Sequence, residues 1–427
     1  MTGWEEKVAT TSGAARGPRH AKAANRPVGD RPTRRIAMYS HDTMGIGHVR
    51  RNLLIAQTLV SSPRPTSILL IAGACEAGAF VMPPGVDCLT LPSLRKDGEG
   101  NYTTRRLGIA IEDLVNLRTQ AIAAVLKSFK PDAFIVDKAP RGALRELEPV
   151  LAMLKANGGT RCILGLREVL DDPVAVWKEW GDLANEEAIR EYYDAVWIYG
   201  DPRVYDTVAE YRLTGDVAAK TRYTGYFDQR RRLEFVPGLR DDPRKQLGLP
   251  PGELVLGMMG GGQDGAELAE AFARADFPPS TNAVLISGPF MPAAVQSRLR
   301  RLVAGRSRFR LLDFVAEPDL LLRQADRVVA MGGYNTVSEV LSFEKRALLI
   351  PRVAPRQEQL IRVKRLHELG LVDMLHPNDV TPAAISAWLA NESQARPHIH
   401  GLLDFDGLAK LPRLLDELLV GRIRPVA

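Results

Sequence analysis

The stretch Ala330–Gln359, AMGGYNTVSEVLSFEKRALLIPRVAPRQEQ, decides the fold of this chain. The apolar run that ends at Met331 predicts a buried strand, the two glycines after it allow a tight turn, and Asn335–Phe343 has a helical pattern. A second apolar run ends at Pro351, and a polar loop then leads into another helix. This order of elements predicts an open parallel sheet that binds ligands at the carboxyl ends of its strands.

The same stretch carries groups suited to a nucleoside diphosphate. Backbone N–H groups at the start of a helix bind phosphate, and Gly332 and Gly333 stand directly before such a start. Glu339, one turn into the helix, can accept hydrogen bonds from the two hydroxyls of a ribose. However, Thr336-x-x-Glu339 also fits a helix capping box, which needs no ligand. The rest of the chain has to decide between the two interpretations.

A family resemblance rests on these residues. Gly332-Gly333-x-Asn335-Thr336-x-x-Glu339, followed by Glu358 and Gln359, resembles the donor-site signature of GT-B nucleotide-sugar glycosyltransferases. It is most similar to glycosyltransferase family 28, which includes the peptidoglycan N-acetylglucosaminyltransferase and the monogalactosyldiacylglycerol synthases. The resemblance implies two Rossmann-like α/β domains whose parallel sheets face each other across a cleft. It also implies that these residues bind the donor, with Glu339 on the ribose.

Length and charge predict two domains and a basic tail. A chain of 427 residues exceeds one ordinary hydrophobic core. Residues 1–35 hold eight basic and three acidic side chains, so they carry most of the net charge of +6. We therefore expect a disordered basic tail (1–34), an acceptor domain (35–234), and a donor-nucleotide domain with a closing helix (235–427). The nearly neutral remainder argues against nucleic acid as a partner.

Cysteine content and hydropathy indicate a cytoplasmic protein. Cys75, Cys88 and Cys162 are odd in number and lack zinc-site spacing, which favours a reducing compartment. The sequence has no run of eighteen apolar residues, which argues against a membrane-spanning helix. The tail has no secretory segment, although its positive charge allows peripheral contact with anionic lipid.

The first glycine loop follows the predicted strand Ile36–Ser40. A dinucleotide-binding fingerprint needs a glycine where Arg50 stands, so that type of site is disfavoured. The loop instead resembles the amino-terminal glycine loop of family 28, which ends in Gly-His, although Met44 and Ile46 replace part of its denser glycine run. The resemblance implies donor contacts for Gly45 and Gly47 and a catalytic role for His48.

Histidine is the natural general base near neutral pH, so His48 is the first choice, either as the base that removes the acceptor proton or as a phosphate and acceptor contact. Asp42 is placed to orient or to replace it, and His41 is a further candidate. Asp137 follows a predicted strand, and we expect it at a carboxyl end of the sheet. The aromatic and charged stretch Asp171–Tyr193 is interpreted as acceptor-side helices or as an ordinary half-buried helical face. Alternating helices and strands indicate a parallel sheet covered on both faces, with further strands at Ile68–Ala72, Val86–Thr90, Ala133–Val136, Cys162–Leu166 and Ala195–Tyr199, and helices at Leu107–Phe129 and Gly142–Ala156.

The pattern restarts after the loop-rich segment Phe235–Leu249. A strand at Leu254–Met259, a turn at Gly260–Gly265 and a helix at Ala266–Arg274 are expected. The turn fits G-x-G-x-x-G, but the next strand ends in Ser287-Gly-Pro, without the acid that a nicotinamide dinucleotide requires.

The family resemblance gives other roles to this half of the chain. It implies that Gly261, Gly262 and Gln263 contact the donor, and that Phe314 and Val315 pack on its base, although a plain core pair is the alternative. The leucines of Leu408–Leu419 predict a closing helix.

The implied reaction moves a sugar from a nucleoside diphosphate, with UDP expected, to the hydroxyl of a glycan, lipid or small-molecule acceptor. Helix amino termini, assisted by Arg352 or Arg356, would neutralise the leaving diphosphate, so neither a metal nor a cofactor is expected. Asp404-x-Asp406 has little weight as a metal site. Two alternatives stay open. One is a nucleotide-sugar 2-epimerase, which needs several acid–base residues such as His41, Asp42, His48 and Asp137. The other is a non-catalytic binding protein.

Overall fold

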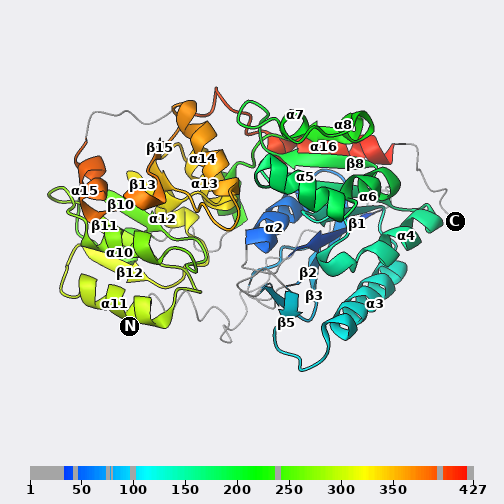
Figure 1. Ribbon diagram of the computed structural model, residues 1–427, viewed down its shortest axis with the longest axis horizontal. Coiled ribbons are helices and arrows are strands. Elements are labelled where there is room, and N and C mark those ends of the chain that lie inside the picture. The colour runs from blue at the N-terminus through cyan, green and yellow to red at the C-terminus, as the bar shows by residue number, and fades with distance from the viewer. Residues whose placement is uncertain are drawn as a thin grey trace. The chain divides into compact units, whose positions relative to one another are not determined.

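The computed structural model describes residues 33–41, 47–73, 77, 80–96, 102–235, 242–391 and 398–420. The chain divides into two compact α/β units (Figure 1). Among the described residues, the N-terminal unit comprises 33–202, Asp206–Tyr226 and 406–420. The C-terminal unit comprises Arg203–Tyr205 and Phe227–Phe405. The sequence analysis put the division at residue 235 and the last helix in the second domain, and most of its predicted basic tail lies outside the described residues.

In the described part of the N-terminal unit, seven strands form one parallel sheet in the order β3-β2-β1-β6-β7-β8-β9. The central strands are buried along most of their length, as expected for a parallel sheet with both faces covered. The strands are β1 (Arg34–Ser40), β2 (Thr66–Ala72), β3 (Val86–Thr90), β6 (Ala133–Asp137), β7 (Arg161–Arg167), β8 (Ala195–Tyr199) and β9 (Thr221–Tyr223).

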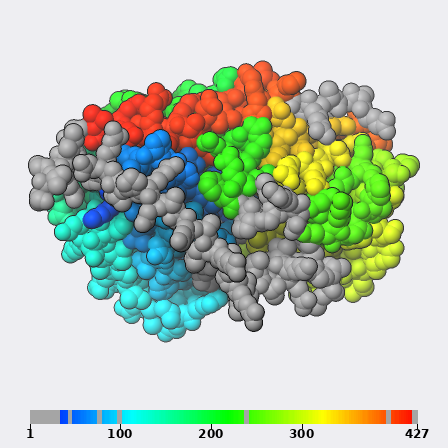
Figure 2. Space-filling view, turned by 180° about the vertical axis from the view of Figure 1, so that it is seen from behind, coloured from blue at the N-terminus to red at the C-terminus, as the bar shows by residue number. Residues whose placement is uncertain are grey.

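Helices cover this sheet, and the carboxyl-terminal helix α16 packs against α2 (Figure 2). The strands β4 (Leu94–Lys96) and β5 (Tyr102–Thr104) form a separate antiparallel pair. The helices are α2 (Gly47–Val60), α3 (Ile111–Phe129), α4 (Glu148–Asn157), α5 (Pro173–Asp182), α6 (Asn185–Tyr192), α7 (Thr207–Glu210), α8 (Gly215–Lys220) and α16 (Gly407–Leu419), with a 3-10 turn η2 (Ala143–Arg145).

The predicted helix Gly142–Ala156 is wrong in its first part. Gly142, Leu144 and Arg145 have φ values of 72°, 49° and 64°, which an α-helix of L-residues does not contain. The chain therefore makes the η2 turn, and the helix begins only at Glu148.

A buried ionic cluster fixes α3 against the end of β1. Arg118 donates to both carboxylate oxygens of Glu146 at 2.6 and 2.7 Å, and the Tyr39 hydroxyl donates to the same carboxylate at 2.5 Å. All three side chains are buried. The cluster holds β1 rigidly two residues before His41.

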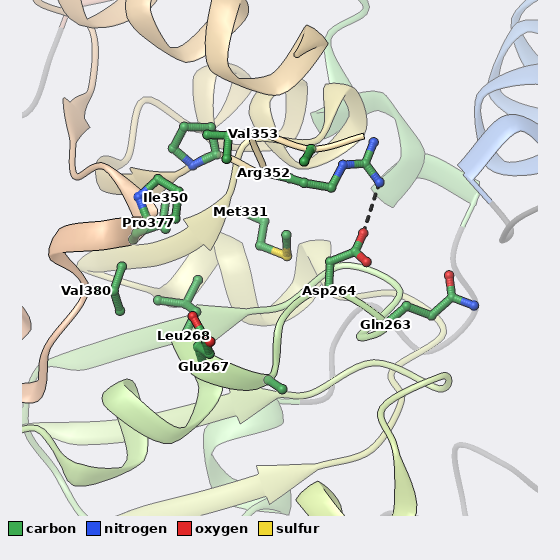
Figure 3. A pocket seen from close by; sticks show the side chains of 13 residues that line it. Gln263, Asp264, Glu267, Leu268, Met331, Ile350, Arg352, Val353, Pro377 and Val380 are labelled. Carbon is green, nitrogen blue, oxygen red and sulfur yellow. Dashed lines mark hydrogen bonds and ion pairs between the residues drawn. The ribbon is translucent and has the colours of Figure 1, made fainter. Parts of the chain in front are cut away.

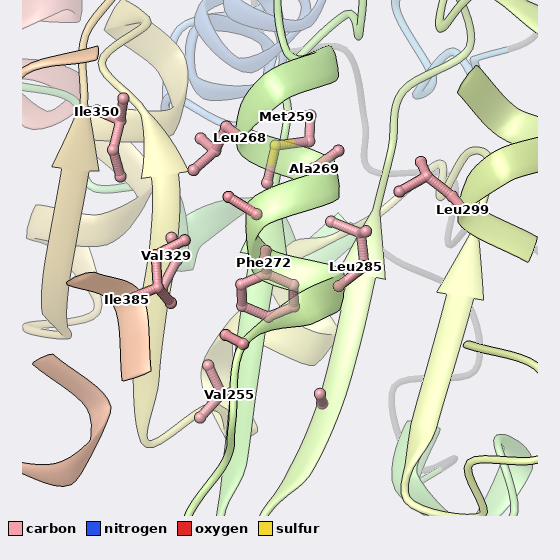
Figure 4. Close-up of a cluster of buried hydrophobic side chains, with 14 of the residues drawn as sticks. Val255, Met259, Leu268, Ala269, Phe272, Leu285, Leu299, Val329, Ile350 and Ile385 are labelled. Atoms are coloured by element: carbon pink, nitrogen blue, oxygen red, sulfur yellow. The ribbon is translucent and has the colours of Figure 1, made fainter. Parts of the chain in front are cut away.

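In the described part of the C-terminal unit, six strands form a second parallel sheet in the order β12-β11-β10-β13-β14-β15. Helices α10, α11 and α15 pack on one face through a core that includes Phe272, Leu299 and Ile385 (Figure 4). The strands are β10 (Leu254–Met258), β11 (Asn282–Ile286), β12 (Phe309–Leu312), β13 (Arg327–Met331), β14 (Arg346–Ile350) and β15 (Asp373–Met374). The helices are α9 (Pro243–Gln246), α10 (Ala266–Arg274), α11 (Ala293–Val303), α12 (Asp319–Gln324), α13 (Tyr334–Ser342), α14 (Glu358–Glu368) and α15 (Pro382–Ala390), with 3-10 turns η3 (Gln229–Phe235) and η4 (Pro377–Asp379).

In each sheet the chain order of neighbouring strands reverses once, between β1 and β6 in the first sheet and between β10 and β13 in the second. In open α/β sheets the crevice for a ligand lies at this switch point, at the carboxyl ends of the strands. The prediction of two Rossmann-like α/β domains with parallel sheets is confirmed. Within the described residues, no helix is both long enough and apolar enough to cross a lipid bilayer.

Candidate functional site

A histidine–aspartate pair occupies the switch point of the N-terminal sheet. His48 is the second residue of α2, which follows β1, and Asp137 is the last residue of the neighbouring strand β6. The Nδ1–H group of His48 donates to Asp137 Oδ2 at 2.5 Å. Arg51, one turn further along α2, donates to Asp137 Oδ1 at 2.5 Å, and its Nη2 lies 3.0 Å from His48 Nδ1.

The surroundings keep His48 neutral and Asp137 ionised. Burial lowers the pKa of His48 to about 4, with help from Arg51 and Lys138, and this outweighs the attraction of Asp137. Burial alone would raise the pKa of Asp137, but the adjacent Arg51 and His48 hold it well below its ordinary value. The side chain of His48 is 21% exposed, whereas that of Asp137 is only 1% exposed. With Nδ1–H bound to a buried carboxylate, Nε2 carries the lone pair of a general base.

His41 and Gly47 lie beside His48 in the structure. The buried His41 has its Nε2 3.3 Å from the Tyr102 hydroxyl, and its ring centroid lies 6.2 Å from that of His48. Gly47 is the first residue of α2. The candidates Asp42 and Gly45 lie outside the described residues.

Sequence reasoning placed Asp137 at a strand end but did not pair it with His48. The missing information was the strand order, because only the adjacency of β1 and β6 puts Asp137 beside the start of α2. A usable signal was present, since β1 ends at Ser40 and His48 follows soon after it, so a strand that packs next to β1 and ends in an acid can complete a His–Asp pair. Arg51 gave no such signal, because an arginine on a helix is usually solvated.

In the C-terminal unit, the glycines after β13 lead into α13. Gly333 is the N-cap of α13 without a side-chain cap, and Asn335 and Thr336 lie within the first turn. A capping box would need Thr336 as the N-cap, so that interpretation of Thr336-x-x-Glu339 is wrong. A Cβ on Gly332 would lie 2.5 Å from Val363 Cγ2, whereas one on Gly333 meets nothing within 4 Å. The approach to the first turn of α13 is therefore open, and Glu339 is buried one turn further on.

The second glycine turn follows β10, the neighbour of β13. Gly262 has φ of 92°, and a Cβ there would lie 2.5 Å from the Ser287 carbonyl oxygen, so the turn needs glycine. Gly261 and Gln263 are exposed. Hence both glycine turns flank the switch point of the C-terminal sheet.

Phe314 and Val315, which are predicted to pack on the nucleobase of the donor, follow β12 and differ in exposure. The ring of Phe314 is 44% exposed, whereas Val315 is buried. Phe314 can therefore stack on a ligand, while the side chain of Val315 has the burial of a core residue.

A cavity of about 430 Å³ adjoins these turns at the carboxyl ends of β10, β13 and β14 (Figure 3). Arg352 donates to Asp264 Oδ2 and to Glu358 Oε1, each at 2.9 Å, and its backbone N–H donates to Gln359 Oε1 at 3.1 Å. Figure 3 shows the Arg352–Asp264 pair at one end of the cavity and Val380 at the other. Arg352 thus connects the start of α14 to the glycine turn. In this structure its guanidinium is paired with two carboxylates.

Across the described ranges, His, Cys, Asp and Glu side chains form no group of three that could hold a metal ion. Asp404 and Asp406, the Asp-x-Asp pair of the sequence, lie in the described part of the chain and are not part of such a group.

Comparisons with known proteins support this fold. No protein-family model matches the chain. Over 159 residues the chain is 26% identical to the UDP-N-acetylglucosamine–N-acetylmuramyl-(pentapeptide) pyrophosphoryl-undecaprenol N-acetylglucosamine transferase of Geobacillus kaustophilus. That match covers 36% of this chain and 43% of the relative, so the chain spans less than half the length of the curated relative it matches.

Two solved structures cover nearly the whole chain. The glycotransferase of kitacinnamycin superposes with a TM-score of 0.59 at 17% identity, over 91% of this chain and 100% of the other. A putative UDP-N-acetylglucosamine 2-epimerase from Listeria monocytogenes gives 0.60 at 14% identity, over 90% and 98%. The chain has the GT-B fold. At these identities the likeness establishes the architecture alone.

Proposed function

We propose that this protein is a metal-independent glycosyltransferase that moves a sugar from a UDP-sugar to an acceptor hydroxyl. The observation that carries the proposal is the His48–Asp137 pair, a neutral and partly exposed histidine held by a buried carboxylate. Perturbed groups of this kind concentrate at functional sites.

His48 acts as the general base. The acceptor hydroxyl donates its hydrogen bond to Nε2, and the proton passes to this atom as the acceptor oxygen bonds to the anomeric carbon. The bond from that carbon to the diphosphate oxygen breaks, and UDP leaves with the electron pair. Asp137 stabilises the imidazolium that forms. General-base catalysis of this type typically raises the rate by about 10²–10⁴-fold.

The C-terminal unit binds the donor. Glu339 accepts from the ribose hydroxyls, Phe314 and Val315 contact the base, and Glu358 with Gln359 contacts the donor at the start of α14. The N–H groups at the start of α13 and in the turn of Gly261, Gly262 and Gln263 meet the charge of the leaving diphosphate. In this scheme no metal ion is required. The scheme is supported by the two glycine turns that flank one switch point.

The curated relative supports the donor and acceptor classes. Its name specifies a UDP-N-acetylglucosamine donor and a pyrophosphoryl-undecaprenol acceptor. We infer a UDP-sugar donor and a glycan, lipid or small-molecule acceptor for this chain. We also infer a cytoplasmic location, with the basic residues 1–35 available for peripheral membrane contact.

Thermal shifts with UDP, GDP and TDP test the donor site. We expect the largest shift with UDP, its loss in Glu339→Ala, and its retention in Glu368→Ala, which removes an exposed acid from α14. We also expect His48→Asn to keep the UDP shift and lose transfer, because an asparagine amide can replace the Nδ1–H bond but cannot accept the proton. Unchanged turnover in His48→Asn would remove His48 from the mechanism.

The structural likeness to a putative UDP-N-acetylglucosamine 2-epimerase keeps one second candidate open. Incubation with a UDP-sugar alone separates the two activities. An epimerase converts the sugar nucleotide into its isomer without an acceptor, whereas the proposed transferase at most hydrolyses it slowly. Isomer formation that depends on His48 would favour the epimerase.

A further inference from the structure

A second cavity, of about 370 Å³, lies in the N-terminal unit between α5 and α6, which pack side by side (Figure 1). One wall carries Trp177 and Trp180, and the other carries Glu186, Glu187 and Arg190 of α6. Its volume falls within the range of small-molecule sites, about 300–1,000 Å³. The base and donor sites described above do not include these residues.

The tryptophan wall is held in place by its own hydrogen bonds. Trp177 and Trp180 are three residues apart on α5, so they share a face of the helix. The indole N–H of Trp177 donates to the Tyr211 carbonyl at 2.8 Å. Asp172 caps α5 by accepting from the backbone N–H groups of Val174 and Ala175. A wall fixed in this way is preorganised, and preorganisation lowers the entropic cost of binding.

Charged side chains of both signs surround the cavity. Arg190 lies 2.6 Å from Asp216, 3.0 Å from Glu186 and 3.8 Å from Glu187. On the opposite side, the guanidinium of Arg212 lies 4.8 Å from the centre of the Trp177 ring. The four charged residues that line the cavity are thus two acids and two arginines.

This combination excludes three ligand classes in turn. An apolar ligand would strip water from four charged side chains without replacing their hydrogen bonds. A cation would meet Arg190 and Arg212, and the latter already covers one face of the Trp177 ring. An anion would meet Glu186 and Glu187. A neutral ligand with an apolar face and many hydroxyls satisfies both walls, and a saccharide has both features.

The cavity is anchored to the catalytic edge of the sheet. The Tyr211 hydroxyl accepts from the backbone N–H of Leu170 at 2.9 Å and donates to the Asp171 carbonyl at 2.8 Å, in the loop that follows β7. β7 lies beside β6, which ends in Asp137. Two strand spacings separate β1 from β7, or about 10 Å. The loop that Tyr211 holds therefore lies two strand positions along the sheet from β1, the strand that precedes His48.

We propose that the cavity between α5 and α6 binds a saccharide portion of the acceptor. The proposal rests on the proposed transferase function and deepens it, because it defines the acceptor as a saccharide or a saccharide-bearing molecule. The transferred sugar comes from the donor, and this site holds the acceptor through sugar units beyond the reacting hydroxyl.

Titrating the full-length protein with neutral tetrasaccharides of glucose, galactose or N-acetylglucosamine tests the site through tryptophan fluorescence, without any donor. Two variants probe it independently. Trp180→Ala removes an aromatic face, and Gly181→Leu fills the cavity at a position where a Cβ meets nothing within 4 Å. Lys178→Ala, which changes an exposed residue of α5 that does not line the cavity, is the matched control.

We expect saturable binding of at least one tetrasaccharide, weakened about tenfold or more in Trp180→Ala and Gly181→Leu and unchanged in Lys178→Ala. His48→Asn should bind normally, so this readout survives even if the transferase proposal fails. With an acceptor in turnover, the two cavity variants should raise KM and leave kcat nearly unchanged. Absence of binding by all three tetrasaccharides, or equal binding by Gly181→Leu, would overturn the proposal.

Discussion

The protonation of His48 gives the sharpest test of the electrostatic reasoning. Burial and Arg51 hold its pKa near 4, against an ordinary value of 6.5. Between these two values the unfolded chain binds a proton that the folded chain does not, so stability rises with pH across this window. The difference corresponds to about 3 kcal/mol, because one pKa unit equals about 1.4 kcal/mol.

Comparison with His48→Asn isolates this contribution. The asparagine amide can still donate to Asp137 but does not titrate. Acids away from this site therefore contribute equally to both proteins, and Arg51 and the amide continue to hold the pKa of Asp137 low. We expect the free energy of unfolding of the wild type to fall by about 3 kcal/mol more than that of His48→Asn between pH 7 and pH 4. Nuclear magnetic resonance of histidine-labelled protein reports the same pKa directly, and His48→Asn assigns the signal.

A midpoint at or above 6.5 would refute the reasoning. It would mean that the attraction of Asp137 for an imidazolium outweighs burial and the charge of Arg51. At a midpoint of 6.5 about a quarter of His48 would be protonated at pH 7, and at a midpoint above 7 most of it would be, so that a general base would have to be sought elsewhere. A midpoint near 4 leaves more than 99% of His48 neutral at pH 7, by the usual tenfold change per pH unit.

Two further predictions concern stability. Gly332→Ala should destabilise the C-terminal unit by about 1–3 kcal/mol in urea unfolding, because its Cβ would meet the buried Val363. Gly333→Ala should leave stability within about 0.5 kcal/mol but weaken UDP binding, and equal unfolding of the two variants would contradict this. Glu146→Gln should cost about 3–5 kcal/mol, since it leaves the buried Arg118 without its carboxylate, and a double variant that replaces both partners with apolar residues should recover part of that loss.

Much of the fold could be predicted from the sequence because buried parallel strands are uniform apolar runs. Val86–Thr90, Ala195–Tyr199 and the helix Ala266–Arg274 have the predicted bounds, and the other predicted strands differ by one or two residues at an end. The antiparallel pair β4–β5 was not predicted. Its three-residue strands are too short to show a period, and they carry ordinary polar side chains.

The candidate site was predictable only within single loops. Gly332, Gly333 and Glu339 share one local pattern, so their order along the chain already placed them on the start of one helix. Asp137 lies eighty-nine residues from His48, and its role depends on strand pairing that no local pattern encodes. The stretch Asp171–Tyr193 was interpreted as acceptor-side helices or a half-buried face, but the part of Arg212 in the cavity could not be predicted, because it requires a tertiary contact with Trp177.

A second ionic network in the N-terminal unit can be compared with the His48 site. The Arg118–Glu146–Tyr39 cluster is an ionic network of similar size, yet its side chains are all buried, and it joins α3 to β1. In contrast, His48 exposes part of its ring while its pKa is displaced far from the ordinary value. A network that serves only packing gains nothing from an exposed, uncharged imidazole that is backed by an ionised carboxylate. The proposed general-base role accounts for that arrangement, because a neutral and partly exposed imidazole can accept a proton from outside the protein.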